Sequence, residues 1–162
     1  MRSSRLRPGL SVPAPRLSAV GVESATVGTV ARDVPSTTLH RVRSACLALP
    51  ETYEEPAWVG TRWRVRTRTF AHLLDVDGGW PKAYSRAAAT DGPATVLTFR
   101  ACGAELGALR CAGPPFFATP WRDDEVGLVL DGSVDWTEVH ELLAESYRLL
   151  APAYLTRLLD AG

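Results

Sequence analysis

Patterns typical of helices stand at both ends of residues 36–162, and patterns typical of strands lie between them. Apolar residues recur at helical spacing over residues 39–47, and Pro50 ends that helix. Near the other end, Asp135 can cap a second helix, with Glu138 three residues on in the capping-box position. This order predicts an α+β fold, an antiparallel sheet built as a meander with helices packed on one face.

The strand patterns begin with a candidate β-hairpin. Trp63 and Val65 alternate with arginines, as in a strand with one covered face, and a second strand follows over residues 69–74. We place the turn between them at residues 66–68. Residues 94–100 are rich in β-branched and aromatic residues and predict another strand. The other expected pieces are an acidic loop, a long loop, a short helix, two short strands and a final short helix, over residues 51–56, 75–93, 104–111, 116–119, 126–130 and from Pro152.

The helix that begins at Asp135 has one apolar face. The residues of this face recur at helical spacing, so we expect them to pack on the sheet. They are Val139, Leu142, Leu143, Ser146 and Tyr147.

Residues 1–35 differ in composition from the rest of the chain. They contain four prolines and five arginines and show no sustained hydrophobic period. Such a segment buries too little apolar surface to offset the entropy cost of ordering it. We therefore expect a disordered N-terminal extension, or an upstream start that does not belong to the native protein, with an Arg-rich targeting peptide as the alternative. Residues 36–162 are expected to form the folded domain.

Charge is spread unevenly along the chain. Residues 36–162 hold 13 basic and 16 acidic groups, whereas residues 1–35 hold five arginines against two acidic groups. A domain that held DNA over its whole surface would normally be basic, so any contact with nucleic acid is expected to be local. No apolar run approaches the roughly 18 residues that span a bilayer. The sequence therefore predicts no membrane association, and its three cysteines, odd in number and without CxxC spacing, predict free thiols in a reducing cytoplasm.

Residues that could carry catalysis or bind a metal are scattered. His40, His72 and His140 stand alone on different predicted elements, and no two cysteines have CxxC spacing. The sequence has no Gly-rich phosphate loop and no nucleophile motif. We expect neither a metal nor another cofactor, and no enzyme activity. A pocket that brings His72 together with a carboxylate of raised pKa would favour an enzyme instead.

The most informative local feature is four arginines at alternate positions. An unbroken strand would place them in one row, whereas a turn at residues 66–68 would place two along a strand and two at a hairpin tip. A guanidinium binds phosphate in bidentate fashion, so the hairpin is a candidate nucleic-acid-binding element. The alternative is a solvated strand face that is neutralised by Glu51, Glu54 and Glu55. The candidate nucleic-acid-binding residues are Arg62, Arg64, Arg66, Arg68 and Arg100.

Tryptophans indicate a second kind of site. Trp63 and Trp136 lie on apolar faces, which predicts that they belong to the core. Three others lie in predicted loops near proline or arginine, so they are candidates to line a ligand pocket. These are Trp58, Trp80 and Trp121.

Short segments spread over the domain carry a family resemblance. They are residues 46–51, 55–58, 63–66, 69–71, 115–117, 126–130, 135–136 and 145–152. On these segments the chain resembles the MmcQ/YjbR-like proteins, often labelled DNA-binding, from about residue 39 to residue 159. The resemblance implies an antiparallel sheet flanked by helices, similar to secretion chaperones, and two hairpins described as wings that touch DNA. The chain departs from the family pattern at Thr67 and Arg68, where relatives often have Gly and Lys, and at Arg100, where Lys is common.

Two functions follow from these observations. The first is weak, sequence-nonspecific and salt-sensitive binding of DNA through the Arg-rich hairpin, without catalysis. The alternative is a module that binds a protein or a small ligand, as a monomer or a homodimer, with no nucleic-acid role. A positive strip on the acidic body would favour the first function, and arginines neutralised by carboxylates would weigh against it.

Overall fold

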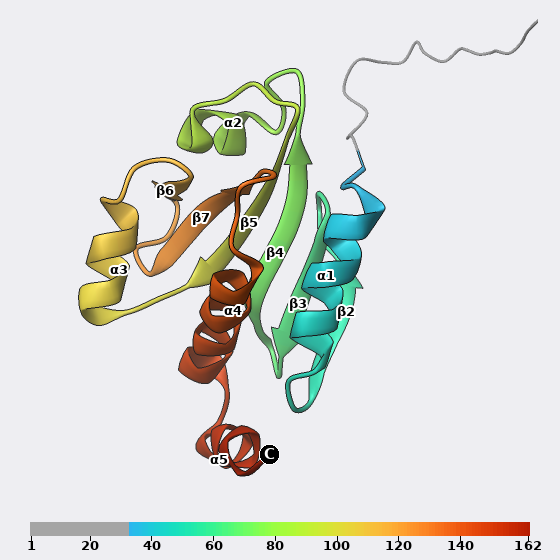
Figure 1. The fold of residues 1–162 in the computed structure, drawn as a ribbon, viewed down its shortest axis with the longest axis vertical. Helices are drawn as coiled ribbons and strands as arrows, with labels where there is room; N and C mark the ends of the chain where they lie inside the picture. Colours follow the sequence, from blue (N-terminus) through green and yellow to red (C-terminus); the bar gives the residue numbers. More distant parts are fainter. Residues whose placement is uncertain (1–32) are drawn as a thin grey trace, which may run out of the picture. The chain divides into compact units, whose positions relative to one another are not determined.

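A computed structural model of the chain describes residues 33–162 (Figure 1), so the predicted N-terminal extension lies outside the described residues except for its last three. The helices of the described part are α1 (Ser36–Leu47), α2 (Lys82–Ala88), α3 (Gly103–Arg110), α4 (Trp136–Leu150) and α5 (Ala153–Ala161). Its strands are β2 (Thr52–Pro56), β3 (Thr61–Val65), β4 (Arg68–Val76), β5 (Ala94–Arg100), β6 (Phe116–Ala118) and β7 (Glu125–Leu130). None of the described helices is both long enough and apolar enough to cross a lipid bilayer.

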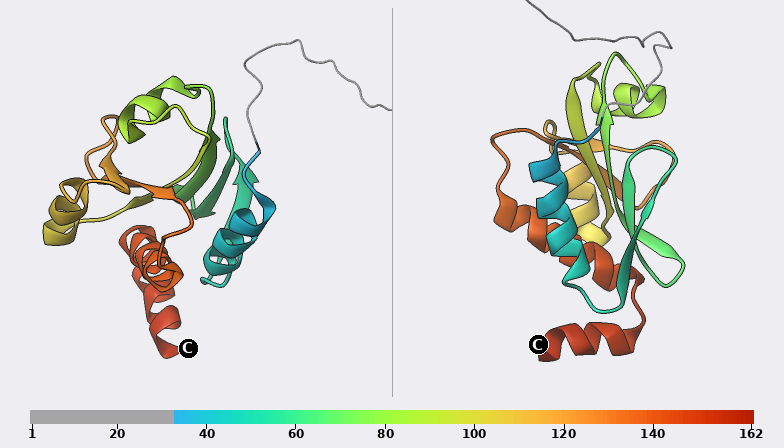
Figure 2. Two further views of the ribbon diagram at one scale, coloured as in Figure 1. Left: turned by 45° about the horizontal axis from the view of Figure 1, so that its top comes forward. Right: turned by 90° about the vertical axis from the view of Figure 1, so that its right-hand side faces the viewer.

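The described strands form an antiparallel sheet in the order β2-β3-β4-β5-β7-β6. The first four follow one another as a meander, and β7 then lies between β5 and the short edge strand β6. Helices α1 and α4 contact each other and cover the same face of the sheet (Figures 1 and 2). The predicted α+β fold with an antiparallel sheet is confirmed.

Helix α4 packs on the sheet through the apolar face that the sequence predicts. All five residues predicted for this face are buried, and Leu150 extends it. Tyr147 meets Phe70 of β4 edge to face, with ring centroids 5.7 Å apart. The Asp135 side chain caps the helix, because it accepts a hydrogen bond from the Thr137 N–H at 2.9 Å.

A buried hydroxyl joins α4 to two strands. The Ser146 hydroxyl donates to the Phe70 carbonyl at 2.6 Å and accepts from the Arg100 N–H at 2.8 Å. The pairing of β4 with β5 stops next to these groups, at Ala71 and Phe99. The hydroxyl therefore satisfies two backbone groups at the point where the strand ladder ends.

The opposite face of the sheet carries α2 and a second, smaller core. Leu73 and Leu74 are adjacent in β4 and so point to opposite faces. Leu73 joins the cluster under α4, whereas Leu74 joins the cluster under α2. The sequence predicts a loop over residues 75–93, and this prediction is wrong: β4 continues to Val76, and the seven-residue α2 follows Pro81. Flanking glycines and prolines, which usually mark turns, conceal so short a helix.

A glycine lets β6 cover the end of this second core. A Cβ added at Gly127 of β7 would lie 2.1 Å from the Phe117 ring. The ring therefore lies directly on the Gly127 backbone, where any side chain would displace it. Phe117 belongs to the cluster under α2.

The sequence predicts an acidic loop over residues 51–56, and this prediction is wrong for all but the first residue, because Thr52–Pro56 form the edge strand β2. The strand pairs with β3 from Thr52, opposite Val65, to Pro56, opposite Thr61. Its charges and its proline suit an edge strand, whose outer backbone groups are unpaired and need protection from further pairing. The same residue types have low strand propensity, which explains why the sequence predicts a loop.

Candidate ligand-binding site

The first two hairpin arginines share one carboxylate. Trp63 and Val65 point into the main core, so Arg62 and Arg64 lie on the α2 face of the sheet. Arg62 donates to Glu55 through Nε at 3.1 Å and forms a closer ion pair with it at 2.5 Å. Arg64 lies 3.6 Å from the same carboxyl group and also donates to a carbonyl of the hairpin turn. Both guanidiniums are therefore held along the strand.

Arg66 and Arg68 flank the tip of the hairpin, and the turn lies where the sequence predicts it. The Arg66 guanidinium lies 3.6 Å from Glu51, donates to the Tyr154 hydroxyl, and stands 5.6 Å from the centre of the Tyr154 ring. Arg68 is exposed, and its side chain makes no ion pair or hydrogen bond within residues 33–162. The tip thus carries one partly engaged arginine and one open arginine.

Glu54 differs from Glu51 and Glu55, the other two acidic residues that were expected to neutralise the four hairpin arginines. Alternate residues of β2 face opposite sides, so Glu54 faces α1 instead. There it binds Arg43 through two contacts of 2.8 Å and accepts from the Trp63 indole N–H at 3.0 Å. These contacts, above all the hydrogen bonds from Arg43, hold the pKa of Glu54 below its usual value.

Arg100, the fifth nucleic-acid candidate, lies on β5, two strands away from the β3 arginines in the sheet order. Only 10% of its side chain is exposed, and it bonds to Asp124 at 3.2 Å. Three of the four hairpin arginines have a carboxylate within 4 Å, which matches the interpretation of a neutralised strand face. DNA binding at the hairpin stays a prediction, and Arg100 lines a pocket elsewhere on the face.

The three candidate pocket tryptophans lie in two places. Trp58 is 82% exposed and lies against Trp80, with ring centroids 5.6 Å apart. Trp121 lies against Tyr84, with ring centroids 4.7 Å apart, and both rings line the pocket that holds Arg100. The structure therefore places Trp121 at this pocket and leaves Trp58 and Trp80 outside its lining.

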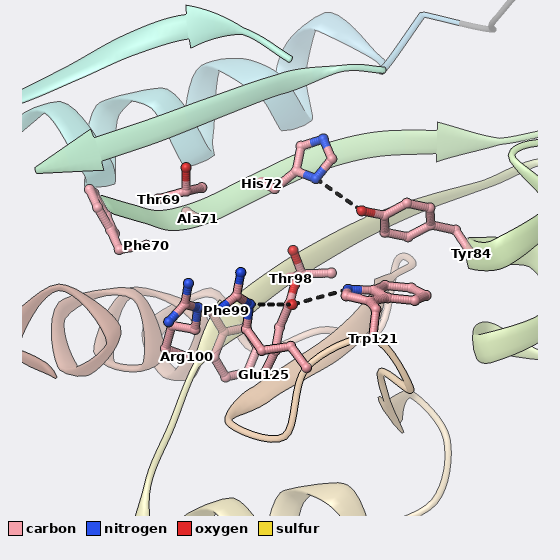
Figure 3. A pocket seen from close by; sticks show the side chains of 11 residues that line it. Thr69, Phe70, Ala71, His72, Tyr84, Thr98, Phe99, Arg100, Trp121 and Glu125 are labelled. Atoms are coloured by element: carbon pink, nitrogen blue, oxygen red, sulfur yellow. Dashed lines mark hydrogen bonds and ion pairs between the residues drawn. The ribbon is translucent and has the colours of Figure 1, made fainter. Parts of the chain in front are cut away.

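This pocket, of about 230 Å³, opens between β4, β5, α2 and the loop that precedes β7 (Figure 3). In Figure 3, His72 and Tyr84 lie on one side of Thr98, and Trp121 and Glu125 lie on the other. Each of the four segments thus contributes to a single hollow. The lining residues that matter for its chemistry are His72, Tyr84, Thr98, Arg100, Trp121 and Glu125.

The strand register explains why polar side chains meet in this place. One cross-strand row runs through β2, β3, β4, β5 and β7, and it includes two residues that line the pocket, His72 and Thr98. The row lies on the side of the sheet away from α1 and α4, so polar groups in it do not enter the main core. The row consists of Glu55, Arg62, His72, Thr98 and Gly127.

His72 is held neutral by its surroundings. Its Nε2 lies 2.6 Å from the Val59 carbonyl oxygen, which can only accept, so Nε2 carries the proton. Nδ1 is then an acceptor and receives the Tyr84 hydroxyl at 3.3 Å. Burial lowers the pKa of His72 and raises the pKa of Tyr84 to about 12. Both groups are therefore uncharged at neutral pH.

Glu125 is the carboxylate of the pocket, and 11% of its side chain is exposed. Its Oε1 accepts from the Trp121 indole N–H at 3.1 Å and lies 3.6 Å from Nε of Arg122. Arg122 is half exposed and also lines the pocket. Oε2 of Glu125 has no protein donor within the described part of the chain.

Reasoning from the sequence named Arg100 and Trp121 as site candidates, and His72 as a residue whose pocket would favour an enzyme. It missed Thr98, Tyr84 and Glu125, which meet them. The available signal for Thr98 was a polar residue inside a predicted strand. Tyr84 could not be placed, because its helix lies in a segment predicted to be a loop. Glu125 follows two aspartates in a run that is typical of an exposed turn.

Solved structures that resemble this chain include proteins of Deinococcus radiodurans and Pseudomonas syringae. A Deinococcus radiodurans protein with a DUF419 domain is 22% identical, covers 69% of this chain and 77% of its own, and has a TM-score of 0.51. A Pseudomonas syringae protein is 17% identical, covers 62% of this chain and 87% of its own, and has a TM-score of 0.49. No curated protein matches the chain.

A family model gives a more specific match. The YjbR model matches residues 47–149, from the end of α1 to near the end of α4. This span contains the six strands of the described sheet and the residues that line the pocket. The chain belongs to the YjbR family.

Proposed function

We propose that this protein is a non-enzymatic binding protein that holds a small ligand in the pocket on the α2 face. The observation that supports this best is the convergence of side chains from four segments on one hollow of about 230 Å³. Aromatic walls with a few fixed polar groups are typical of small-molecule sites. Pockets for drug-sized ligands have volumes of roughly 300–1,000 Å³, so the ligand of this pocket is smaller.

The walls of the pocket are fixed before a ligand arrives. Tyr84 is held by its hydrogen bond to His72, and Trp121 is held by its hydrogen bond to Glu125. A site that is ordered in advance loses less conformational entropy on binding. This order supports a binding role for the pocket.

The contacts of His72 support binding rather than catalysis. A pocket that holds a histidine and a carboxylate is a candidate active site, and His72 and Glu125 both line this one. A general base needs a free lone pair within reach of its substrate. Val59 and Tyr84 engage both ring nitrogens of His72, so neither nitrogen is open for proton transfer.

The test is an NMR titration of the isotopically labelled protein with small compounds of positive, negative and zero charge. We expect shift changes to gather at Tyr84, Thr98 and the Trp121 indole N–H. The Trp58 indole, outside the lining of the pocket, serves as the internal control. Compounds that move no signals, or only signals outside the pocket, would overturn the proposal.

Weak DNA binding at the hairpin tip is the second candidate function, and the open side chain of Arg68 supports it. Within residues 33–162, Arg68 has no carboxylate partner, and 53% of the Arg66 side chain is exposed. Two phosphate contacts would give a log–log salt slope of about −2. Four free arginines would give a slope of roughly −3.6.

Anisotropy of a labelled DNA duplex at low salt tests this candidate. The double replacement Arg66→Ala and Arg68→Ala should weaken binding and flatten the salt slope. The control is the charge-matched pair Lys82→Ala and Arg86→Ala, two exposed cations on α2, which packs against β6 and β7 rather than against the hairpin tip. Equal affinities of the two double variants would rule out the hairpin tip.

A further inference from the structure

The charged groups that line the pocket carry a positive excess. They are Arg100, Arg122 and Glu125, since His72 is neutral. Glu125 already accepts from Trp121 and pairs with Arg122. Arg100 is therefore the charged residue of the lining whose counterion, Asp124, lies outside the lining.

Arg100 is nine-tenths buried but only partly satisfied. Its guanidinium bonds through one nitrogen to Asp124 at 3.2 Å, and Asp124 itself is 47% exposed. A guanidinium has five N–H donors, and the other nitrogens of Arg100 have no acceptor within the described part of the chain. A charge removed from bulk water needs partners, and an anion in the pocket would supply them.

The hydroxyl of a second β5 residue, Thr98, offers another donor to the pocket. Thr98 is 2% exposed, and its hydroxyl bonds to no other group of residues 33–162. Thr98 and Arg100 are two residues apart in β5, so they point to the same face of the sheet. Both line the pocket (Figure 3). An anion placed between them would receive hydrogen bonds from two sides.

The aromatic walls indicate what the rest of the ligand is like. Tyr84 and Trp121 meet at an interplanar angle of 57°, and Trp121 is 41% exposed. The uncovered part of an indole ring offers a flat apolar surface on which another ring can stack. The volume of about 230 Å³ suits a compound with a single ring.

We propose that the ligand is a small aromatic anion, with its acidic group bound by Arg100 and Thr98 and its ring against Trp121 and Tyr84. This inference rests on the proposed function of the pocket and adds the chemical class of the ligand. An organic cation is the opposite class. Glu125 Oε2 would have to bind it, but two guanidiniums of the same lining would repel it.

Five probes of similar size separate the classes. Sodium benzoate and phenyl phosphate are aromatic anions, benzamide is neutral, benzylamine is a cation, and cyclohexanecarboxylate is an anion without a flat ring. We expect benzoate or phenyl phosphate to bind at least tenfold more tightly than benzamide and benzylamine, and several-fold more tightly than cyclohexanecarboxylate. The stronger of the two aromatic anions identifies the acidic group. The readout is the shift of the Trp121 indole N–H.

Two variants test the residues that bind the anion. Arg100→Gln should weaken the binding of the aromatic anion at least tenfold, and Thr98→Val, which keeps the shape of the side chain, should weaken it about fivefold. Arg86→Gln removes a charge from α2 outside the lining and should leave affinity unchanged. If Arg100→Gln fails to fold, Thr98→Val decides the question alone.

The outcomes separate this inference from the proposed function. Benzylamine or benzamide binding in the pocket while the anions do not would overturn the ligand class and leave a ligand-binding pocket. Affinity for the anions that neither Arg100→Gln nor Thr98→Val lowers would overturn the assigned contacts. No shift of pocket signals with any of the five probes would overturn this inference, and the wider titration described above would then decide the proposed function.

Discussion

The face of the sheet under α1 and α4 and the face under α2 treat their polar groups differently. On the first face, the polar side chains within the packing are matched: Glu54 binds Arg43 and Trp63, and Ser146 bonds to two strands. On the second face, Arg100 and Thr98 keep donors that no described residue accepts. Matched groups stabilise the fold, whereas open donors are available to a ligand, so the proposed function assigns stability to the first face and binding to the second.

The lengths of α4 and α2 explain why donors stay open on the second face and not on the first. Helix α4 has 15 residues and lies across β4 and β5, whereas α2 has seven and packs mainly against β6 and β7. A helix rises about 1.5 Å per residue, so α2 covers about half the length that α4 covers. The part of the second face that α2 leaves uncovered holds the pocket.

The largest expected change in the free energy of unfolding comes from replacing two adjacent leucines of β4 that point to opposite faces. Both are fully buried. Leu73→Ala should lower the free energy of unfolding by about 3–4 kcal/mol, and Leu74→Ala by about 2–3 kcal/mol, because the larger cluster around Leu73 collapses less readily around a cavity. Urea denaturation measures both. A larger loss for Leu74→Ala would reverse the assignment of stability to the α4 face.

The next largest expected loss of stability comes from the close contact between Gly127 and Phe117 at the end of the second core. Gly127→Ala would force the Phe117 ring off the β7 backbone and cost about 2 kcal/mol. Adding Phe117→Ala should remove most of the penalty of the extra methyl group, because the clash is then gone. Additive losses in a double-mutant cycle would show that the two residues do not meet.

A carboxylate on each face gives a third comparison. Glu54→Gln should cost about 1 kcal/mol at pH 7, a modest value because 40% of the Arg43 side chain is exposed. The pKa of Glu54 is lowered by folding, so its contribution is complete above its ordinary value of 4.5 and is lost as the pH falls through the folded-state pKa. The difference between Glu54→Gln and wild type should therefore vanish in acid.

Glu55→Gln is the matched control for this measurement, because Glu55 lies next to Glu54 but faces the α2 side and is bound only by Arg62 and Arg64. Its effect should be the smaller of the two. Equal effects at pH 7 would remove the contrast between the faces.

The smallest effect is a pH dependence on the second face. Burial lowers the pKa of His72 from its ordinary value of 6.5, so the unfolded chain binds the proton more readily. The contribution of neutral His72 to stability is thus full above pH 6.5 and falls as the pH drops below it, with a slope of at most about 1.4 kcal/mol per pH unit. Denaturation at pH 7 and pH 5.5 measures the change. His72→Gln should lose this dependence, and the exposed His140→Gln should keep it.

Elements with a strong period were predictable from the sequence, and elements without one were not. The apolar face of α4 and the strand over residues 94–100 match the structure, because each alternates or repeats over enough residues to be recognised. Helix α2 has only seven residues between glycines and prolines, and β2 is an acidic edge strand. Helix α2 packs against β6 and β7, which are distant in the sequence, and β2 is a strand because it pairs with β3. The local pattern within each segment reports neither kind of contact.

The candidate site was predictable only in part, for a related reason. The arginine row was visible from its alternation, but the acidic residues that neutralise it take their places only when β2 pairs with β3. Arg100 and Trp121 were named for different sites, and the fold brings them to one pocket. Tyr84 joins that pocket from α2 and Glu125 from the first position of β7, so the pocket is assembled by tertiary structure rather than by any motif.

Ser146 of α4 links the main core to the strand that carries the pocket residue Arg100. Its hydroxyl hydrogen-bonds to the main chain of Arg100, the residue whose side chain lies in the pocket on the far side of the sheet. A ligand that pulled Arg100 out of place would strain the hydrogen bond from the Arg100 N–H to Ser146 of α4, although the ligand itself would not touch α4. Amide hydrogen exchange at the end of β5 would therefore register events on both surfaces of the protein.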